Sequence, residues 1–161
     1  MVNTGKTTRW RLRAPRLPAV CVLALSVLAA AVAVAVTSKG LSVEELKARQ
    51  ATASAGERPR LCLEIAEREL TFADKFYADG ETEKGQAALS DVAVFCESAR
   101  DNSIQSGKHL KQTEISVRQM ARKLNDLKHR VTHDEQTAVQ DTIDRLQKVR
   151  DDLLAAMFHK G

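Results

Sequence analysis

Apolar residues recur at alternating spacings of three and four along one stretch of the chain, residues 89–131. This spacing is typical of a helix that buries one narrow stripe of side chains, a seam, against other helices. The repeat, which includes the polar seam positions Ser103 and Thr113, keeps its register through residues 101–107, although this part is rich in serine and contains Gly107. A glycine inside a helix costs only about 1 kcal/mol relative to alanine. The pattern therefore favours one long helix over residues 82–131, with two helices joined at Gly107 as the alternative.

Two shorter helices are predicted to fold back on the ends of this long helix. Apolar residues at helical spacing mark residues 60–78 and 135–159, and Gly80 suits the turn between the first of these helices and the long one. In an antiparallel hairpin, the residue numbers of any two facing residues add up to the same value, and we call this the constant-sum rule. The seam that the helices are expected to share consists of Leu89, Val92, Leu110, Val117, Met120, Leu124, Leu127, Val131, Ile143, Leu146, Leu153 and Met157.

The shorter helices leave the serine-containing middle of the long helix uncovered. Ser42 and Glu45 form a capping-box pattern that opens a further short helix, residues 43–50. This helix either packs on the bare middle or belongs to a flexible neck. The expected fold class is all-α, with a long central helix and antiparallel helical partners at each end, as a three- to four-helix bundle or coiled-coil-like hairpins.

The first 36 residues hold the basic excess of the chain. Lys6 and four arginines stand there without an acidic residue, whereas the net charge of the whole chain is only +4. This basic arm precedes an apolar run over residues 19–36, the arrangement that sends the following residues across a membrane. We expect residues 1–36 to be a signal peptide or a retained membrane anchor, residues 37–59 a short helix and linker, and residues 60–161 an exported helical domain. The domain would be periplasmic, or anchored in the inner membrane with its body outside the cytoplasm.

Charge is also uneven along the body. Residues 108–131 contain seven basic and two acidic residues, whereas residues 132–161 contain more acidic than basic ones. Either the acidic last helix balances the basic stretch within one molecule, or opposite faces of two molecules associate head to tail, which added salt would weaken. Because the body without its leader is close to neutral, the charge gives no argument for a nucleic-acid partner.

Cys62 and Cys96 face each other across the first predicted turn. Export would place them in an oxidising compartment, so a disulfide between them is the sharpest chemical prediction. The alternative is that both are small buried apolar side chains, since facing cysteines in helices often miss disulfide geometry.

Histidines are the candidate metal ligands. His129 and His133 stand four residues apart and could bind one divalent ion if a single helix ran through both. His109 and His159 are expected to approach each other at the opposite end of the same hairpin. Each pair supplies only two of the usual four ligands, so we expect no metal and no cofactor. The sequence also lacks a phosphate-binding loop, a serine elbow and a CxxC motif, so we expect no enzymatic activity.

Two resemblances add to this interpretation. The first predicted hairpin resembles a single tetratricopeptide repeat. The residues that carry this resemblance are Phe72, Ala73, Phe76, Gly80, Gly85, Leu89 and Val92. Residues 43–158 also resemble a group of uncharacterised exported bacterial all-helical proteins, in residues 44–49, 58–70 and 145–158. The first resemblance implies a helical hairpin. The second implies a fold and a compartment, and it brings no known activity.

The sequence thus predicts an exported, non-catalytic helical scaffold or protein-interaction module of the cell envelope. It would bind a protein partner, or itself, through the uncovered part of the seam, and the membrane through residues 19–36 if the leader is retained. Two alternatives stay open. One is a metal-binding or stress-sensing envelope protein that uses the histidine pairs, and the other is an enzyme with a pocket between the hairpins.

Overall fold

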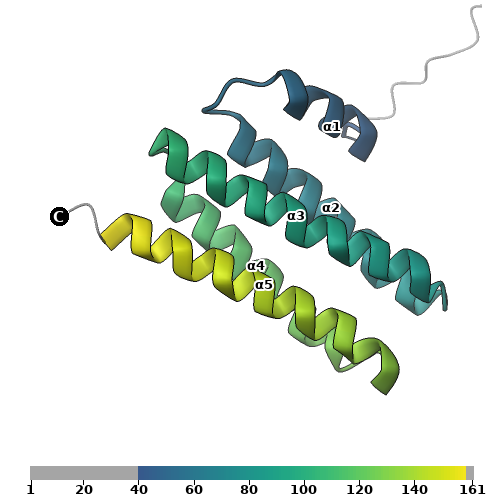
Figure 1. The fold of residues 1–161 in the computed structure, drawn as a ribbon. Helices are drawn as coiled ribbons and strands as arrows, with labels where there is room; N and C mark the ends of the chain where they lie inside the picture. Colours follow the sequence, from purple (N-terminus) through teal and green to yellow (C-terminus); the bar gives the residue numbers. More distant parts are fainter. Residues whose placement is uncertain (1–39, 159–161) are drawn as a thin grey trace, which may run out of the picture. The chain divides into compact units, whose positions relative to one another are not determined.

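The computed structural model of the chain describes residues 40–158, and every regular element in this part is an α-helix (Figure 1). The prediction of an all-α fold is therefore confirmed for these residues. In chain order the helices are α1 (Val43–Thr52), α2 (Arg58–Ala78), α3 (Thr82–Ser106), α4 (Leu110–Lys128) and α5 (His133–Phe158).

Local signals set several of the helix ends. The Ser42 hydroxyl accepts a hydrogen bond from the Glu45 backbone N–H at 3.2 Å, and the Glu45 carboxylate accepts one from the Ser42 N–H at 2.6 Å, so the predicted capping box is present. Pro59 lies in the first turn of α2, where its missing N–H costs nothing. Gly80 adopts a φ of 76° in the turn between α2 and α3.

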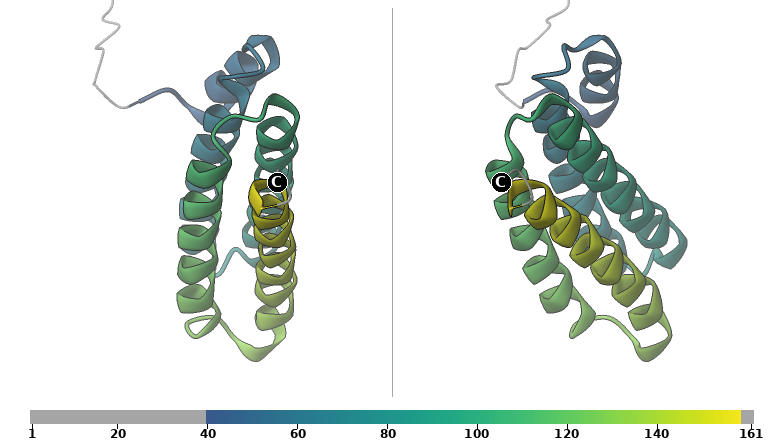
Figure 2. Two further views of the ribbon diagram at one scale, coloured as in Figure 1. Left: turned by 90° about the vertical axis from the view of Figure 1, so that its left-hand side faces the viewer. Right: turned by 60° about the vertical axis from the view of Figure 1, so that its left-hand side comes forward.

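Two antiparallel hairpins make up most of the described chain. The first consists of α2 and α3, and the second of α4 and α5. The hairpins pack so that α3 lies along α5 and α2 lies, less extensively, along α4. Because successive helices alternate in direction, α2 and α4 run the same way (Figures 1 and 2).

The chain reverses direction between α3 and α4, as Figure 2 shows, so the predicted single helix over residues 82–131 is wrong. α3 ends at Ser106, and Gly107 follows with a φ of 65°, the left-handed conformation that closes many helices. His109 is also left-handed, with a φ of 61°, immediately before α4 begins. The seven-residue register continues across the break because seam positions on both sides of this short connection face the same core.

The middle of the predicted seam is covered rather than bare. Ala99 and Ser103 of α3 and Thr113 of α4 are all fully buried. The Ser103 Oγ and Thr113 Oγ1 atoms lie 2.8 Å apart, in a hydrogen bond that joins the two helices. The expectation that a partner binds to an exposed middle of the seam is therefore wrong, because the reversal of the chain places α4 and α5 over it.

Most of the predicted seam residues nevertheless belong to the core. Nine of them have no more than 2% of their surface exposed: Leu89, Val92, Val117, Met120, Leu124, Leu127, Ile143, Leu146 and Leu153. Leu110 and Val131 are half-buried and pack against the same cluster. Met157 is half-buried near the end of α5.

The two helices of the first hairpin approach closely at Gly85. A Cβ atom added to this residue of α3 would lie 2.8 Å from Cε2 of Tyr77 on α2. Only a glycine allows the ring and the α3 backbone to pack at this separation.

The short helix α1 packs on the start of α2, so it neither covers the middle of the seam nor serves as a free neck. The residues of this contact are Val43, Leu46, Leu61 and Ile65. Lys47 adds ion pairs to Asp91 of α3, at 3.0 Å, and to Glu69 of α2, at 3.3 Å. Burial lowers the pKa of Lys47, but hydrogen bonds and charge from these two carboxylates raise it overall.

The predicted signal peptide or anchor, residues 1–36, lies outside the described residues. Within residues 40–158, no helix combines the length and the apolar character that crossing a membrane requires.

Candidate functional site

A groove runs between α2 and α4, and we call it the α2–α4 groove. Its first hollow, of about 390 Å³, lies near the start of both helices and is lined by Arg60, Leu63, Glu64, Glu67, His109, Gln112 and Ser116. Its second hollow, of about 250 Å³, lies nearer their ends and is lined by Leu70, Thr71, Asp74, Lys123, Asp126, Leu127 and Arg130.

Helical spacing brings the side chains of the first hollow together. Leu63 and Glu67 are four residues apart on α2, and so are Gln112 and Ser116 on α4. Residues at this spacing lie one above the other on a single helix face. Both faces line the same hollow, so they oppose each other along the groove.

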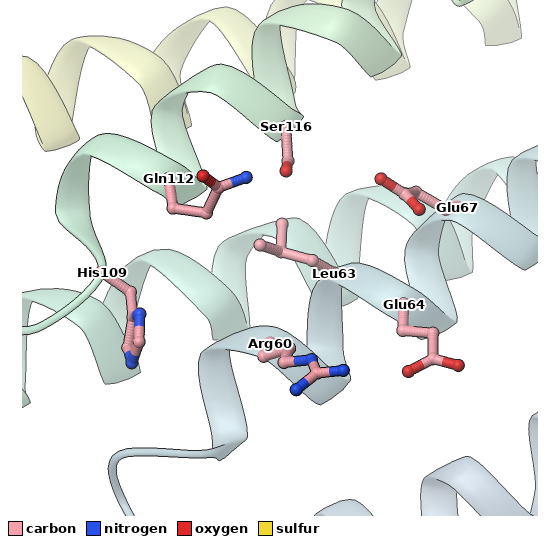
Figure 3. A pocket seen from close by; sticks show the side chains of 7 residues that line it. All are labelled: Arg60, Leu63, Glu64, Glu67, His109, Gln112 and Ser116. Carbon is pink, nitrogen blue, oxygen red and sulfur yellow. The ribbon is translucent and has the colours of Figure 1, made fainter.

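The side chains of the first hollow divide into two groups (Figure 3). Gln112, Ser116 and Glu67 point towards the space above Leu63, which forms an apolar floor. Arg60, Glu64 and His109 point away from that space. The hollow thus presents one carboxylate, one hydroxyl and one amide around a leucine, with a charged and exposed rim.

This arrangement suits a side chain that is apolar along its stem and basic at its tip. The Leu63 surface would contact the methylene groups of a lysine or arginine. The Glu67 carboxylate would then accept hydrogen bonds from the charged head, a stronger kind of hydrogen bond than one between neutral groups. The Ser116 hydroxyl and the Gln112 amide would satisfy the remaining donors or neighbouring backbone groups.

An ion pair crosses the groove at its second hollow. Arg130, just after α4, places Nη2 2.6 Å from Oδ1 of Asp74 on α2. Beyond it, Tyr77, Thr132 and Glu135 line a further hollow. The Tyr77 hydroxyl is buried and has no hydrogen-bond partner among the described residues. Burial raises the pKa of Tyr77, and the charge of Glu135 adds to the shift.

The histidines do not form the chelating pair that a continuous helix would create. α4 ends at Lys128, His129 caps it, and α5 begins at His133 after a turn, so no single helix runs through both. Among residues 40–158 there is no group of three or more potential metal ligands. His109 is exposed at the rim of the first hollow, and His159 lies outside the described residues.

Cys62 and Cys96 are fully buried between α2 and α3 and are present as free thiols, so the predicted disulfide is not formed in the structure. Burial raises the pKa of both thiols, and the charge of Glu97 and the nearness of Cys62 contribute further at Cys96. The two cysteines are therefore neighbours, as the constant-sum rule placed them. That they bond in an oxidising compartment stays a prediction.

Sequence reasoning missed the α2–α4 groove, although one signal for it was present. Gln112 and Ser116 stand beside the seam residues Thr113 and Val117, so polar groups flank the apolar stripe on one side. A stripe with a polar flank indicates a helix face at the edge of a core. The opposing face comes from α2, and the two faces meet only because the chain reverses at Gly107.

Comparison of the chain with protein-family models, with curated proteins and with solved structures finds no match. The function of the groove therefore has to be inferred from its own residues.

Proposed function

We propose that this protein is a non-catalytic helical-bundle scaffold of the cell envelope that binds a helix of a partner protein in the α2–α4 groove. The observation that carries the proposal is the first hollow, where three polar groups converge over the Leu63 floor between two helices of the same direction. Two such helices flank a trough along their common axis, and an amphipathic helix can pack its apolar face into a trough of this kind.

The rim of the groove indicates the chemistry of this partner. Glu64, Glu67 and Asp74 come from α2 and outnumber Arg60, so that side of the groove carries a net negative charge. On the α4 side, Gln112 and Ser116 are uncharged, and Lys123 and Arg130 outnumber Asp126. A partner helix would therefore place a lysine or arginine at Glu67, between apolar residues that face Leu63 and Leu70. Complementary charge of this kind fixes the register of a complex and rejects wrong partners.

The leader supports a location outside the cytoplasm. Residues 1–18 are basic and residues 19–36 are apolar, the order found in signal peptides and in membrane anchors. We propose that residues 1–36 export the body or hold it at the inner membrane, in line with the resemblance to exported all-helical proteins.

Site-specific photo-crosslinking in cells that produce the protein tests this function. A benzophenone amino acid replaces either Gln112, in the first hollow, or Gln86, an exposed residue of α3 that lines none of the hollows described here. We expect a discrete protein adduct from position 112 and none from position 86. The same adducts from both positions, or none from either, would refute the groove as the binding surface.

A charge reversal then tests the partner's chemistry. Glu67→Lys should abolish the adduct at position 112, because it opposes the basic residue expected in the hollow. Asp141→Lys makes the same charge change at an exposed residue of α5 and should leave the adduct intact. Equal loss from both variants would show a general charge effect and would contradict the proposed contact.

A further inference from the structure

A second groove lies between α4 and α5, and three arginines line it. Arg118 and Arg122 come from α4, and Arg150 comes from α5. Asn125 of α4 and Gln147 of α5 line it as well, so each helix also supplies an amide group. The volume of this α4–α5 groove is about 330 Å³.

The spacing of these residues explains why their side chains converge. Arg118, Arg122 and Asn125 follow one another at intervals of four and three, which places them on one face of α4. Gln147 and Arg150, three residues apart, share a face of α5. The antiparallel packing of α4 and α5 holds these two faces on opposite sides of the groove.

The floor of the α4–α5 groove is apolar. Val117 and Leu146 are fully buried beneath it. Ala121 lies between Arg118 and Arg122 in sequence, and its short side chain leaves space that a larger residue would fill. An apolar floor keeps water from one side of a bound ion, so charges in the groove interact more strongly than on an open surface.

The arginines carry more positive charge than the adjacent carboxylate neutralises. Glu114, only 7% exposed, has its Oε1 atom 2.8 Å from Arg150 Nε and 3.6 Å from Arg118 Nε. Arg122 forms no ion pair with any other residue in the described range 40–158. The groove thus holds three guanidinium groups, and Glu114 contacts only two of them.

The acidic residues of α5 do not balance this charge. Within the described chain, the one ion pair between α4 and α5 takes its arginine from α5 and its carboxylate from α4. Asp152 of α5 pairs instead with Arg100 of α3, at 2.9 Å. The expectation that the acidic last helix neutralises the basic stretch within one molecule is therefore not met at this groove.

We infer that the α4–α5 groove binds a phosphate oxyanion. A guanidinium group presents N–H donors in a planar fork that matches phosphate oxygens, and it keeps its charge at any physiological pH. Arg122 has its full set of donors free of ion pairing within the described residues, and the contact of Arg118 with Glu114 is long enough to rearrange. The phosphate could belong to a soluble phosphorylated molecule or to the headgroup of an anionic phospholipid, and the chemistry of recognition is the same.

Nuclear magnetic resonance of the full 161-residue chain, held in non-ionic detergent, tests this inference. The Nε–Hε signals of ¹⁵N-labelled arginines report each guanidinium separately. Inorganic pyrophosphate stands for a soluble phosphate, and glycerophosphoglycerol stands for the phosphodiester headgroup of phosphatidylglycerol. We expect saturable shifts at Arg118, Arg122 and Arg150 with at least one probe, and the probe that binds more tightly identifies the source.

Two substitutions on α4 supply the matched comparison. Arg122→Gln and Lys111→Gln each remove one exposed positive charge, but Lys111 lines none of the grooves described here. Arg122→Gln should weaken binding by about tenfold, the effect of losing a charge-assisted hydrogen bond. Lys111→Gln should change it by less than about twofold, because its charge is screened by solvent. The inference is overturned if neither probe gives saturable shifts, or if both variants weaken binding equally.

Discussion

Two hydroxyl groups decide how the middle of the core is built. Ser103 and Thr113 occupy seam positions where an apolar side chain would be expected, and a seam with such residues looks weak in the sequence. In the structure each hydroxyl satisfies the other at 2.8 Å, and both residues are fully buried. A buried polar group is tolerated when it has a partner. The pairing also favours one register of α3 against α4, because a slip of either helix would separate the two groups.

Thr113→Val should lower the free energy of unfolding by about 1–3 kcal/mol, because it leaves the Ser103 hydroxyl buried without its partner on α4. Valine has nearly the same shape as threonine, so the change adds no cavity. Urea denaturation followed by circular dichroism measures the effect. Thr137→Val, at an exposed position of α5, is the control and should be close to neutral.

A double-mutant cycle with Ser103→Ala separates the hydrogen bond from the rest of the packing. Removing both hydroxyls should cost less than the sum of the two single changes, by about 0.5–3 kcal/mol, since no polar group then remains unpaired. Strict additivity would show that the two hydroxyls are not coupled.

At the scale of whole helices, the sequence was most informative where the signal is local. The capping box at Ser42 and the turn at Gly80 were both predicted from neighbouring residues alone, and both are confirmed. The sequence favours a continuous helix over a break at Gly107, because a long helix tolerates one glycine and the seam keeps its register through it. Packing between helices decides between one continuous helix and two helices. A hydrophobic repeat within one segment contains no information about that packing.

Substitutions at the break between α3 and α4 should have effects of opposite sign to those in a continuous helix. Gly107→Ala should destabilise the protein by about 1 kcal/mol, because alanine is strained at a φ of 65°. His109→Gly should stabilise it by a similar amount, since His109 also has a positive φ. In a continuous helix Ala would be favoured at residue 107 and Gly disfavoured at residue 109.

Thermal and urea denaturation of both variants measure these changes in the free energy of unfolding. Gly56→Ala is the control, because its added Cβ would come no closer than 3.9 Å to Lys108 and its φ is not positive. A stabilising Gly107→Ala together with a destabilising His109→Gly would contradict the reversal of the chain.

At the scale of the molecule, the sequence predicted which residues are buried better than which surfaces are exposed. Helical periodicity identified the core because burial on one helix face leaves a pattern within a single segment. The α2–α4 groove depends on two helices that meet only because the chain reverses at Gly107, whereas the α4–α5 groove lies within the hairpin that the turn after α4 forms. Leu63 and Ser116 are therefore distant in the sequence and line the same hollow, and no local pattern joins them.

The two buried cysteines connect the stability of the fold to the compartment in which it forms. A thiol must lose its proton to attack a disulfide, and burial raises the pKa of Cys62 and Cys96, so few thiolates form once α2 and α3 have packed. We therefore expect a Cys62–Cys96 bond to form during folding in an oxidising compartment rather than afterwards. Closing the loop between them would raise the free energy of unfolding by about 3–4 kcal/mol if the geometry is unstrained.

Two preparations of the full chain with Cys21→Ser, which leaves only this pair, test the order of events. One is refolded with oxidised glutathione, which accepts the two electrons, and the other is refolded reduced and exposed to the same reagent afterwards. Non-reducing peptide mapping should find the bond in the first preparation, while the second keeps two thiols that react with iodoacetamide only in denaturant.

Rapid formation of the disulfide in the second preparation would show that α2 and α3 open readily. Two alkylatable thiols in protein taken from the envelope would show that the body folds without the bond, and packing alone would then hold the first hairpin together.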